Sequence, residues 1–114
     1  MRLAWMFALA ALCGCSKGPQ ADLASIAAAR SLGAEWALVN QEAADGHLTA
    51  VYADTMHKQL RQQLQSTQVS LTQPDSNYGR EIQALLRQPD DASAETLRAS
   101  ASRLKQIEDG LESA

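Results

Sequence analysis

His57 is the side chain in this 114-residue sequence whose neighbours come nearest to a catalytic arrangement. Asp54 lies three residues before it and Arg61 four residues after it, and these spacings bring side chains together on one face of a helix. A carboxylate beside an imidazole is the start of a general base. However, Lys58 lies four residues after Asp54 and competes for its carboxylate, and no nucleophile accompanies the group. The pattern therefore favours a solvated surface network over a catalytic site.

Histidine and methionine side chains also raise the question of a metal site. The candidate ligands are His47, at a predicted turn, and Met56 and His57, on the helix that follows. No further ligand with zinc-type spacing accompanies them, and the sequence has neither a glycine-rich phosphate loop nor a serine in a nucleophile elbow. The sequence therefore predicts no cofactor and no enzymatic activity. A metal-binding or ligand-sensing module stays open as an alternative.

The two cysteines, Cys13 and Cys15, follow an apolar segment at residues 3–12 that Arg2 precedes. This order of positive charge, apolar run and small residues is typical of a secretory signal peptide. The apolar run is about half of the roughly 20 residues that a helix needs to cross a bilayer, so it predicts export rather than a membrane span. Cleavage after Ala10 fits the A-x-A pattern and would release a soluble secreted protein.

A second cleavage pattern ends at Cys15. The letters LCGC at residues 12–15 resemble the lipobox of bacterial lipoproteins, in which a leucine stands three residues before the cysteine that becomes the acylated N-terminus. Cys13 stands where alanine or serine is more usual. The resemblance implies that residues 1–14 are a signal peptide and that Cys15 carries lipid. Ser16 after the acylated cysteine implies the outer membrane, with the protein facing the periplasm.

Other roles for the two cysteines fit less well. A disulfide between Cys13 and Cys15 would close a very tight ring, and a Cys-x-Cys metal site would need further ligands. Cleavage before Cys15 removes Arg2 and takes the formal net charge from −3 to −4. Because an acidic domain gains nothing from counterion release at phosphates, the composition argues against a nucleic-acid partner. Residues 15–20 would form a short tether close to the membrane.

Residues 21–114 predict a small all-α domain that begins with a helical hairpin. Apolar residues recur at alternating spacings of three and four in two long segments, residues 22–45 and residues 50–71. Gly46 fits the end of the first helix, and Thr49 fits the N-cap of the second. Two helices of this length joined by a short turn must lie antiparallel.

Two further helices are predicted after the TQPDSN sequence at residues 72–77. The third is short and runs from Ser76 to about Gln88, and the fourth begins after the QPDDAS sequence, with Asp91 or Ser93 as its N-cap. Valine and isoleucine are few and do not alternate with polar residues, so no strand is predicted. The four helices together predict a small up-down bundle.

The first long segment carries apolar residues on more than one side. Trp36 lies on its main stripe, Ala37 on a second face of mostly small side chains with Ile26, Gly33 and Ala44, and Leu38 well away from the stripe. We favour a central helix that buries two faces. An exposed docking strip that uses Trp36, Ala37 and Leu38 is the alternative. The predicted core is thin, so a partner protein or self-association would add stability.

These features predict a small lipid-anchored protein of the bacterial envelope, held at the outer membrane by Cys15. We expect it to act as a structural or protein-interaction module without catalytic activity. The alternatives are a periplasmic module that binds a metal or another ligand, and a soluble secreted helical protein. An enzyme that acts on envelope polymers has no group of residues to support it.

Overall fold

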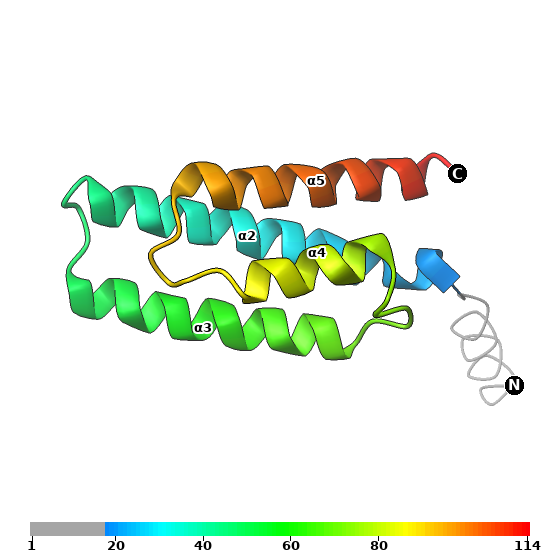
Figure 1. The fold of residues 1–114 in the computed structure, drawn as a ribbon, viewed down its shortest axis with the longest axis horizontal. Helices are drawn as coiled ribbons and strands as arrows, with labels where there is room; N and C mark the ends of the chain where they lie inside the picture. Colours follow the sequence, from blue (N-terminus) through cyan, green and yellow to red (C-terminus); the bar gives the residue numbers. More distant parts are fainter. Residues whose placement is uncertain (1–17) are drawn as a thin grey trace, which may run out of the picture.

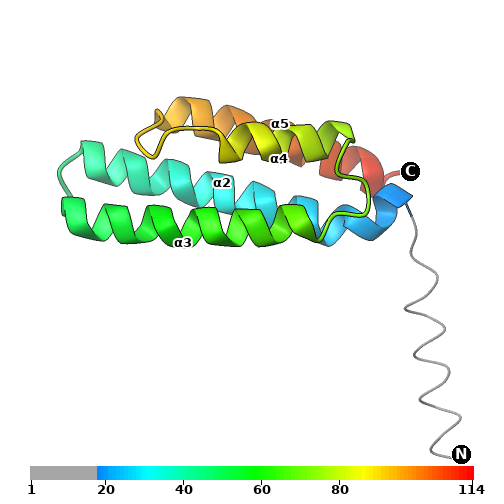
Figure 2. The ribbon, with the colours of Figure 1, turned by 60° about the horizontal axis from the view of Figure 1, so that its bottom comes forward.

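The structure, a computed structural model, describes residues 18–114. A 3-10 helix, η1 (Gly18–Asp22), precedes four α-helices: α2 (Leu23–Ala44), α3 (Ala50–Val69), α4 (Asn77–Leu86) and α5 (Ala94–Glu112). The helices run alternately in opposite directions, with α2 and α3 in one layer and α4 and α5 in the other (Figures 1 and 2). The predicted all-α up-down bundle, with its helical hairpin and short third helix, is confirmed. The predicted signal peptide and Cys15 lie outside the described residues.

Local sequence signals set the ends of the helices. The side chains of Thr49, Ser76 and Ser93 each accept a hydrogen bond from the backbone N–H three residues later, which satisfies one of the free donors at a helix start. Ser93, not Asp91, is therefore the N-cap of α5. Gly46 follows the end of α2 with a φ of +77°, in the left-handed region that glycine occupies without strain. The predicted caps at Thr49 and Gly46 are confirmed.

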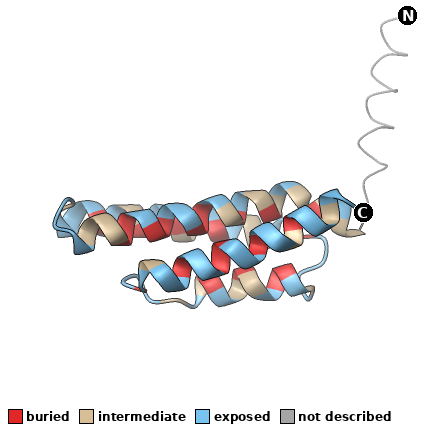
Figure 3. Cartoon of the chain, turned by 90° about the horizontal axis from the view of Figure 1, so that it is seen from above, coloured by how far each residue is buried: buried red, intermediate tan, exposed pale blue. Residues whose placement is uncertain are grey.

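α2 is the central helix, because it packs against α3 on one side and α5 on another. Trp36, on its main stripe, and Ala37, on its small-residue face, are both fully buried. Figure 3 shows buried positions in red alternating with exposed positions in pale blue along the helices. A Cβ added at Gly33 would lie 3.3 Å from Leu85 Cδ2, so α4 also approaches this face closely. The interpretation of α2 as a helix with two buried faces is confirmed. The alternative prediction of an exposed docking strip is wrong for Trp36 and Ala37, because both side chains are buried. Leu38, the third residue of that strip, is exposed.

The buried carboxylate of Asp22 joins η1 to the connection between α3 and α4. It accepts hydrogen bonds from the hydroxyl of Tyr78 at 2.6 Å, the backbone N–H of Thr72 at 2.8 Å and the backbone N–H of Gln73 at 3.2 Å. Burial by itself would raise the pKa of Asp22, but these hydrogen bonds outweigh it and hold that pKa below its ordinary value. Residues 18–20, which we assigned to the tether, therefore belong to a helix that is fixed to the domain.

Different segments of the chain lie at the two ends of the bundle. η1 and the end of α5 lie at one end, where the Gln20 side chain donates to the backbone carbonyl of Leu111 at 2.9 Å (Figure 1). The turn between α2 and α3 lies at the opposite end. Among the helices of residues 18–114, none has both the length and the apolar character needed to cross a membrane.

Candidate functional site

The closed end of the α2–α3 hairpin projects beyond the start of α5 (Figures 1 and 2). A cavity lies where α2 passes the start of α5. Its volume is about 450 Å³. The lining comes from the last turns of α2, from His57 on α3, and from residues 91–94 at the start of α5. We call this space the hairpin cavity. It exists because α2 and α3 continue past the point where the α4–α5 layer ends.

His57 lies between the helices and is only 9% exposed. Its Nε2 is 2.7 Å from the Oδ1 of Asn40 on α2. Asp54 instead pairs with Lys58 at 3.2 Å, as their spacing suggested. The predicted solvated network around His57 is therefore wrong. The sequence does hold a signal for its burial, because His57 continues the spacing of the buried residues Ala53, Leu60 and Leu64 on the same helix.

Asn40 fixes the protonation pattern of the His57 ring. The Nδ2 of Asn40 donates to the backbone carbonyl of Asp90 at 2.9 Å and to that of Ala92 at 2.7 Å. Carbonyl oxygens can only accept, so both hydrogens of Nδ2 are used and Oδ1 must be the acceptor toward His57. The Nε2 of His57 therefore carries a hydrogen, and in the neutral ring the lone pair lies on Nδ1.

The Nδ1 atom of His57 has no hydrogen-bond partner among residues 18–114. Every buried side-chain nitrogen and oxygen in this part of the chain does have a partner, so Nδ1 must be within reach of solvent. His57 lines the hairpin cavity. The site therefore combines a cavity with a largely buried histidine in its lining, and the Nδ1 of this histidine is an unused hydrogen-bond acceptor.

Arg61 does not pair with His57, although the two residues are four positions apart. It binds the segment between α4 and α5 instead. Its guanidinium donates to the backbone carbonyls of Leu86, at 2.7 Å, and Gln88, and to the carboxylate of Asp90 at 2.6 Å. The same guanidinium lies 4.8 Å from the centre of the Trp36 ring, within the range of a cation–π contact. We call Trp36, Asn40 and Arg61 the loop clasp, because all three bind the backbone or side chains of residues 86–92.

The loop clasp and His57 form one continuous polar layer beside the cavity. Trp36 Nε1 donates to the same Asp90 carbonyl that Asn40 binds, at 3.0 Å, and the Trp36 and His57 ring centres are 6.3 Å apart. Trp36, His57 and Arg61 were identified from the sequence, whereas Asn40 and Asp90 were not. Trp36 and Asn40 lie 54 and 50 residues before Asp90 in the sequence. The spacing of neighbouring residues does not indicate contacts over such separations.

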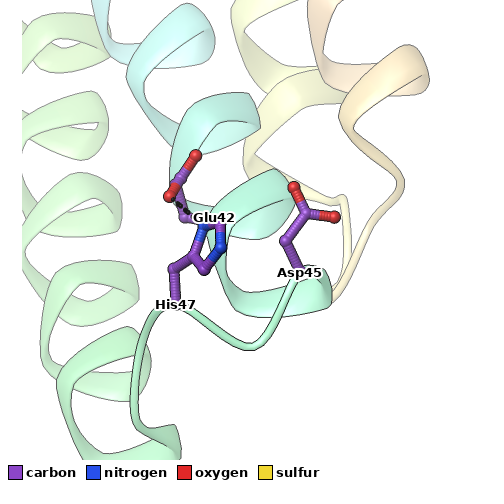
Figure 4. A group of neighbouring side chains, drawn as sticks. All are labelled: Glu42, Asp45 and His47. Atoms are coloured by element: carbon purple, nitrogen blue, oxygen red, sulfur yellow. Dashed lines mark hydrogen bonds and ion pairs between the residues drawn. The ribbon is translucent and has the colours of Figure 1, made fainter.

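His47 lies at the turn of the hairpin, as predicted, beside two carboxylates (Figure 4). Its Nδ1 is 2.8 Å from Oε2 of Glu42, and the potential ligand atoms of Glu42, Asp45 and His47 all lie within 4.8 Å of one another. The two carboxylates were not among the ligands predicted from the sequence. His57 belongs to no such group of three within the described residues, and Met56 packs against the hydrophobic core.

Comparison of the chain with protein-family models, with curated proteins and with solved structures gives no match. The fold and the site by themselves define a small all-α up-down bundle. Its distinguishing feature is a cavity at the closed end of the first hairpin, with a buried histidine in its wall.

Proposed function

We propose that the protein is a lipid-anchored module of the bacterial envelope that presents the closed end of its hairpin to a partner protein. The lipobox resemblance at Cys15 supplies the anchor of this proposal. The observation that carries it further is that η1 begins at Gly18, three residues after Cys15, and is fixed to the domain through Asp22. A lipid on Cys15 would therefore hold the η1 end of the bundle next to the membrane.

The length of α2 sets the reach of such an anchored domain. Its 22 residues span about 33 Å at 1.5 Å per residue. With η1 at the membrane, the turn of the hairpin would stand roughly that far from the anchored end, if the bundle stands upright. The domain would thus act as a stiff spacer, since α2 is central and packs against both α3 and α5.

Exposed apolar side chains support a contact surface near the turn. Val51 and Tyr52, in the first turn of α3, are 78% and 54% exposed. Tyrosine is enriched at protein interfaces, because it combines a large apolar surface with a polar tip. Leu38 is a further exposed apolar side chain on α2. We propose that Val51 and Tyr52 contribute to the partner contact.

Lipid labelling and membrane fractionation of Cys15→Ala test the anchor. We expect this variant to lose both the incorporated lipid and its sedimentation with the outer membrane. Cys13→Ala is the matched control, because Cys13 would leave with the signal peptide, and it should keep both properties. Unchanged labelling and sedimentation of Cys15→Ala would contradict the proposal and favour cleavage after Ala10 or another anchor.

Crosslinking in intact cells, followed by purification of the tagged protein, tests the partner. We expect one envelope protein to be recovered with the wild type and to be lost with Cys15→Ala. Recovery of self-crosslinked species alone would contradict a heterologous partner and indicate a homo-oligomer.

A further inference from the structure

The hairpin cavity has the dimensions and walls of a small-molecule site. Its volume of about 450 Å³ falls within the range of roughly 300–1,000 Å³ that is usual for ligand pockets. The side chains of Ala43, Ala44, Ala92 and Ala94 line it, so much of its wall is made of methyl groups. Such a wall suits an apolar body of modest size.

His57 sets the polar requirement for a ligand. Asn40 forces the Nε2 of His57 to donate, which leaves Nδ1 as an acceptor that no described residue uses. The ring is more than nine-tenths buried and is held by hydrogen bonds of 2.7–2.9 Å that continue into the α4–α5 connection. A ligand that uses this atom must therefore bring a hydrogen-bond donor.

The charge around the cavity favours a cation. Of the side chains that line the cavity, that of Asp91 is a carboxylate, and none belongs to Lys or Arg. Lys58 and Arg61 pair with Asp54 and Asp90. Asp91 itself lines the cavity and makes no ion pair with any residue of 18–114. The Asp91 carboxylate therefore favours a positively charged group in the cavity and disfavours another carboxylate.

We propose that the hairpin cavity binds a small protonated amine with an apolar body. The apolar part packs against the alanine methyl groups, and the ammonium group donates a hydrogen bond to Nδ1 of His57 near the Asp91 carboxylate. This site is separate from the predicted anchor and from the partner contact at Val51 and Tyr52. Its test therefore gives the same answer whether or not Cys15 carries lipid.

Four ligands matched in shape or charge test the chemistry on the purified full-length protein. Cyclohexylamine carries the full proposed pattern, cyclohexanol lacks the charge, cyclohexanecarboxylate reverses it, and methylamine lacks the apolar body. NMR titration of a 15N-labelled sample reports on the His57 ring nitrogens and on the backbone amides of Ala92 and Ala94. We expect saturable shifts at these positions with cyclohexylamine, and affinity at least about tenfold weaker for the other three.

Variants on both sides of the cavity locate the binding. His57→Gln removes the Nδ1 acceptor and should weaken cyclohexylamine binding about tenfold or more. His47→Gln is its control, because His47 lies at the same end of the bundle but does not line the cavity. Ala44→Leu fills part of the cavity from an exposed position on α2, and Ala34→Leu makes the same change at an exposed position of α2 outside it.

The expected pattern is loss of binding in His57→Gln and Ala44→Leu, with retention in both controls. Equal binding of cyclohexanol or of the carboxylate would overturn the proposed ligand class. Shifts that persist in Ala44→Leu, or the absence of saturable shifts with cyclohexylamine, would overturn the site. If His57→Gln does not fold, the two alanine variants decide the location, because both changes lie at exposed positions.

Discussion

Replacing Asp22 by asparagine probes the contact that fixes η1 to the bundle. One carboxylate oxygen accepts from the backbone N–H of Thr72, and the other accepts from the hydroxyls of Tyr78 and Thr72 and from the N–H of Gln73. Asparagine offers a single acceptor oxygen, and its NH₂ group must face at least one of these donors. The better orientation places the NH₂ opposite the Thr72 N–H, which leaves that part-buried donor without its partner.

The size of the effect follows from that mismatch. An unsatisfied buried donor costs about 1–3 kcal/mol, so the part-buried N–H of Thr72 should cost about 1 kcal/mol, and the remaining hydrogen bonds lose the strength that the negative charge gave them. We therefore expect Asp22→Asn to lower the free energy of unfolding by about 2–3 kcal/mol at pH 7. For a domain of this length, that corresponds to a fall in Tm of roughly 10–20 °C. Thermal and urea unfolding, followed by circular dichroism, measure both quantities.

The pH dependence gives this prediction a second test. The folded-state pKa of Asp22 lies below its ordinary value of 3.8, so its stabilising contribution is fully present above that value. The contribution is lost as the pH falls through the folded-state pKa. The difference in stability between the wild type and Asp22→Asn should thus be constant from pH 5 to 7 and shrink below about pH 4.

Asp75→Asn is the matched control, because Asp75 is exposed in the same connection between α3 and α4. Its effect should stay within about 0.5 kcal/mol. The role assigned to Asp22 would be refuted by an Asp22→Asn variant as stable as this control. A stability difference that is the same at pH 3 and pH 7 would refute it as well.

Two further predictions concern backbone contacts. Gly79→Ala would place a Cβ 2.1 Å from the carbonyl oxygen of Pro74, so the start of α4 must shift. We expect urea unfolding to show a free energy of unfolding that is lower by more than about 3 kcal/mol. Gly110→Ala, where nothing lies within 4 Å, should instead stabilise α5 by about 0.5–1 kcal/mol; equal effects of the two changes would contradict the packing at Gly79. Arg61→Lys keeps the charge but loses the planar fork of donors, so the amides of residues 86–92 should exchange with solvent at least about tenfold faster. Unchanged exchange would contradict the loop clasp.

The parts of the fold that local spacing determines could be predicted from the sequence. The apolar residues of α2, α3 and α5 recur every three or four positions, and capping depends on residues within one turn, as at Thr49 and Gly46. The spacing of apolar residues also predicted the two buried faces of α2. Ala44 was placed on the small-residue face but is exposed, because α5 does not extend that far along α2.

The polar contacts of the candidate site could not be predicted in this way. Asp22, Asn40 and His57 are polar side chains on or beside apolar stripes, and a single sequence does not report whether such a side chain has a buried partner. Those partners lie between 17 and 56 residues away. The cavity likewise depends on where the α4–α5 layer ends against a longer hairpin, which is a property of the packed bundle.

Site-specific photocrosslinking in intact cells tests most directly whether the closed end of the hairpin is the surface that contacts a partner. A photoreactive residue in place of Tyr52 probes that end. The same residue in place of Val69, whose side chain is 86% exposed, probes the opposite end of α3. We predict a crosslink from position 52 to a single envelope protein and none from position 69. Crosslinks to that protein from position 69 alone, or equally from both positions, would contradict a contact at the closed end of the hairpin.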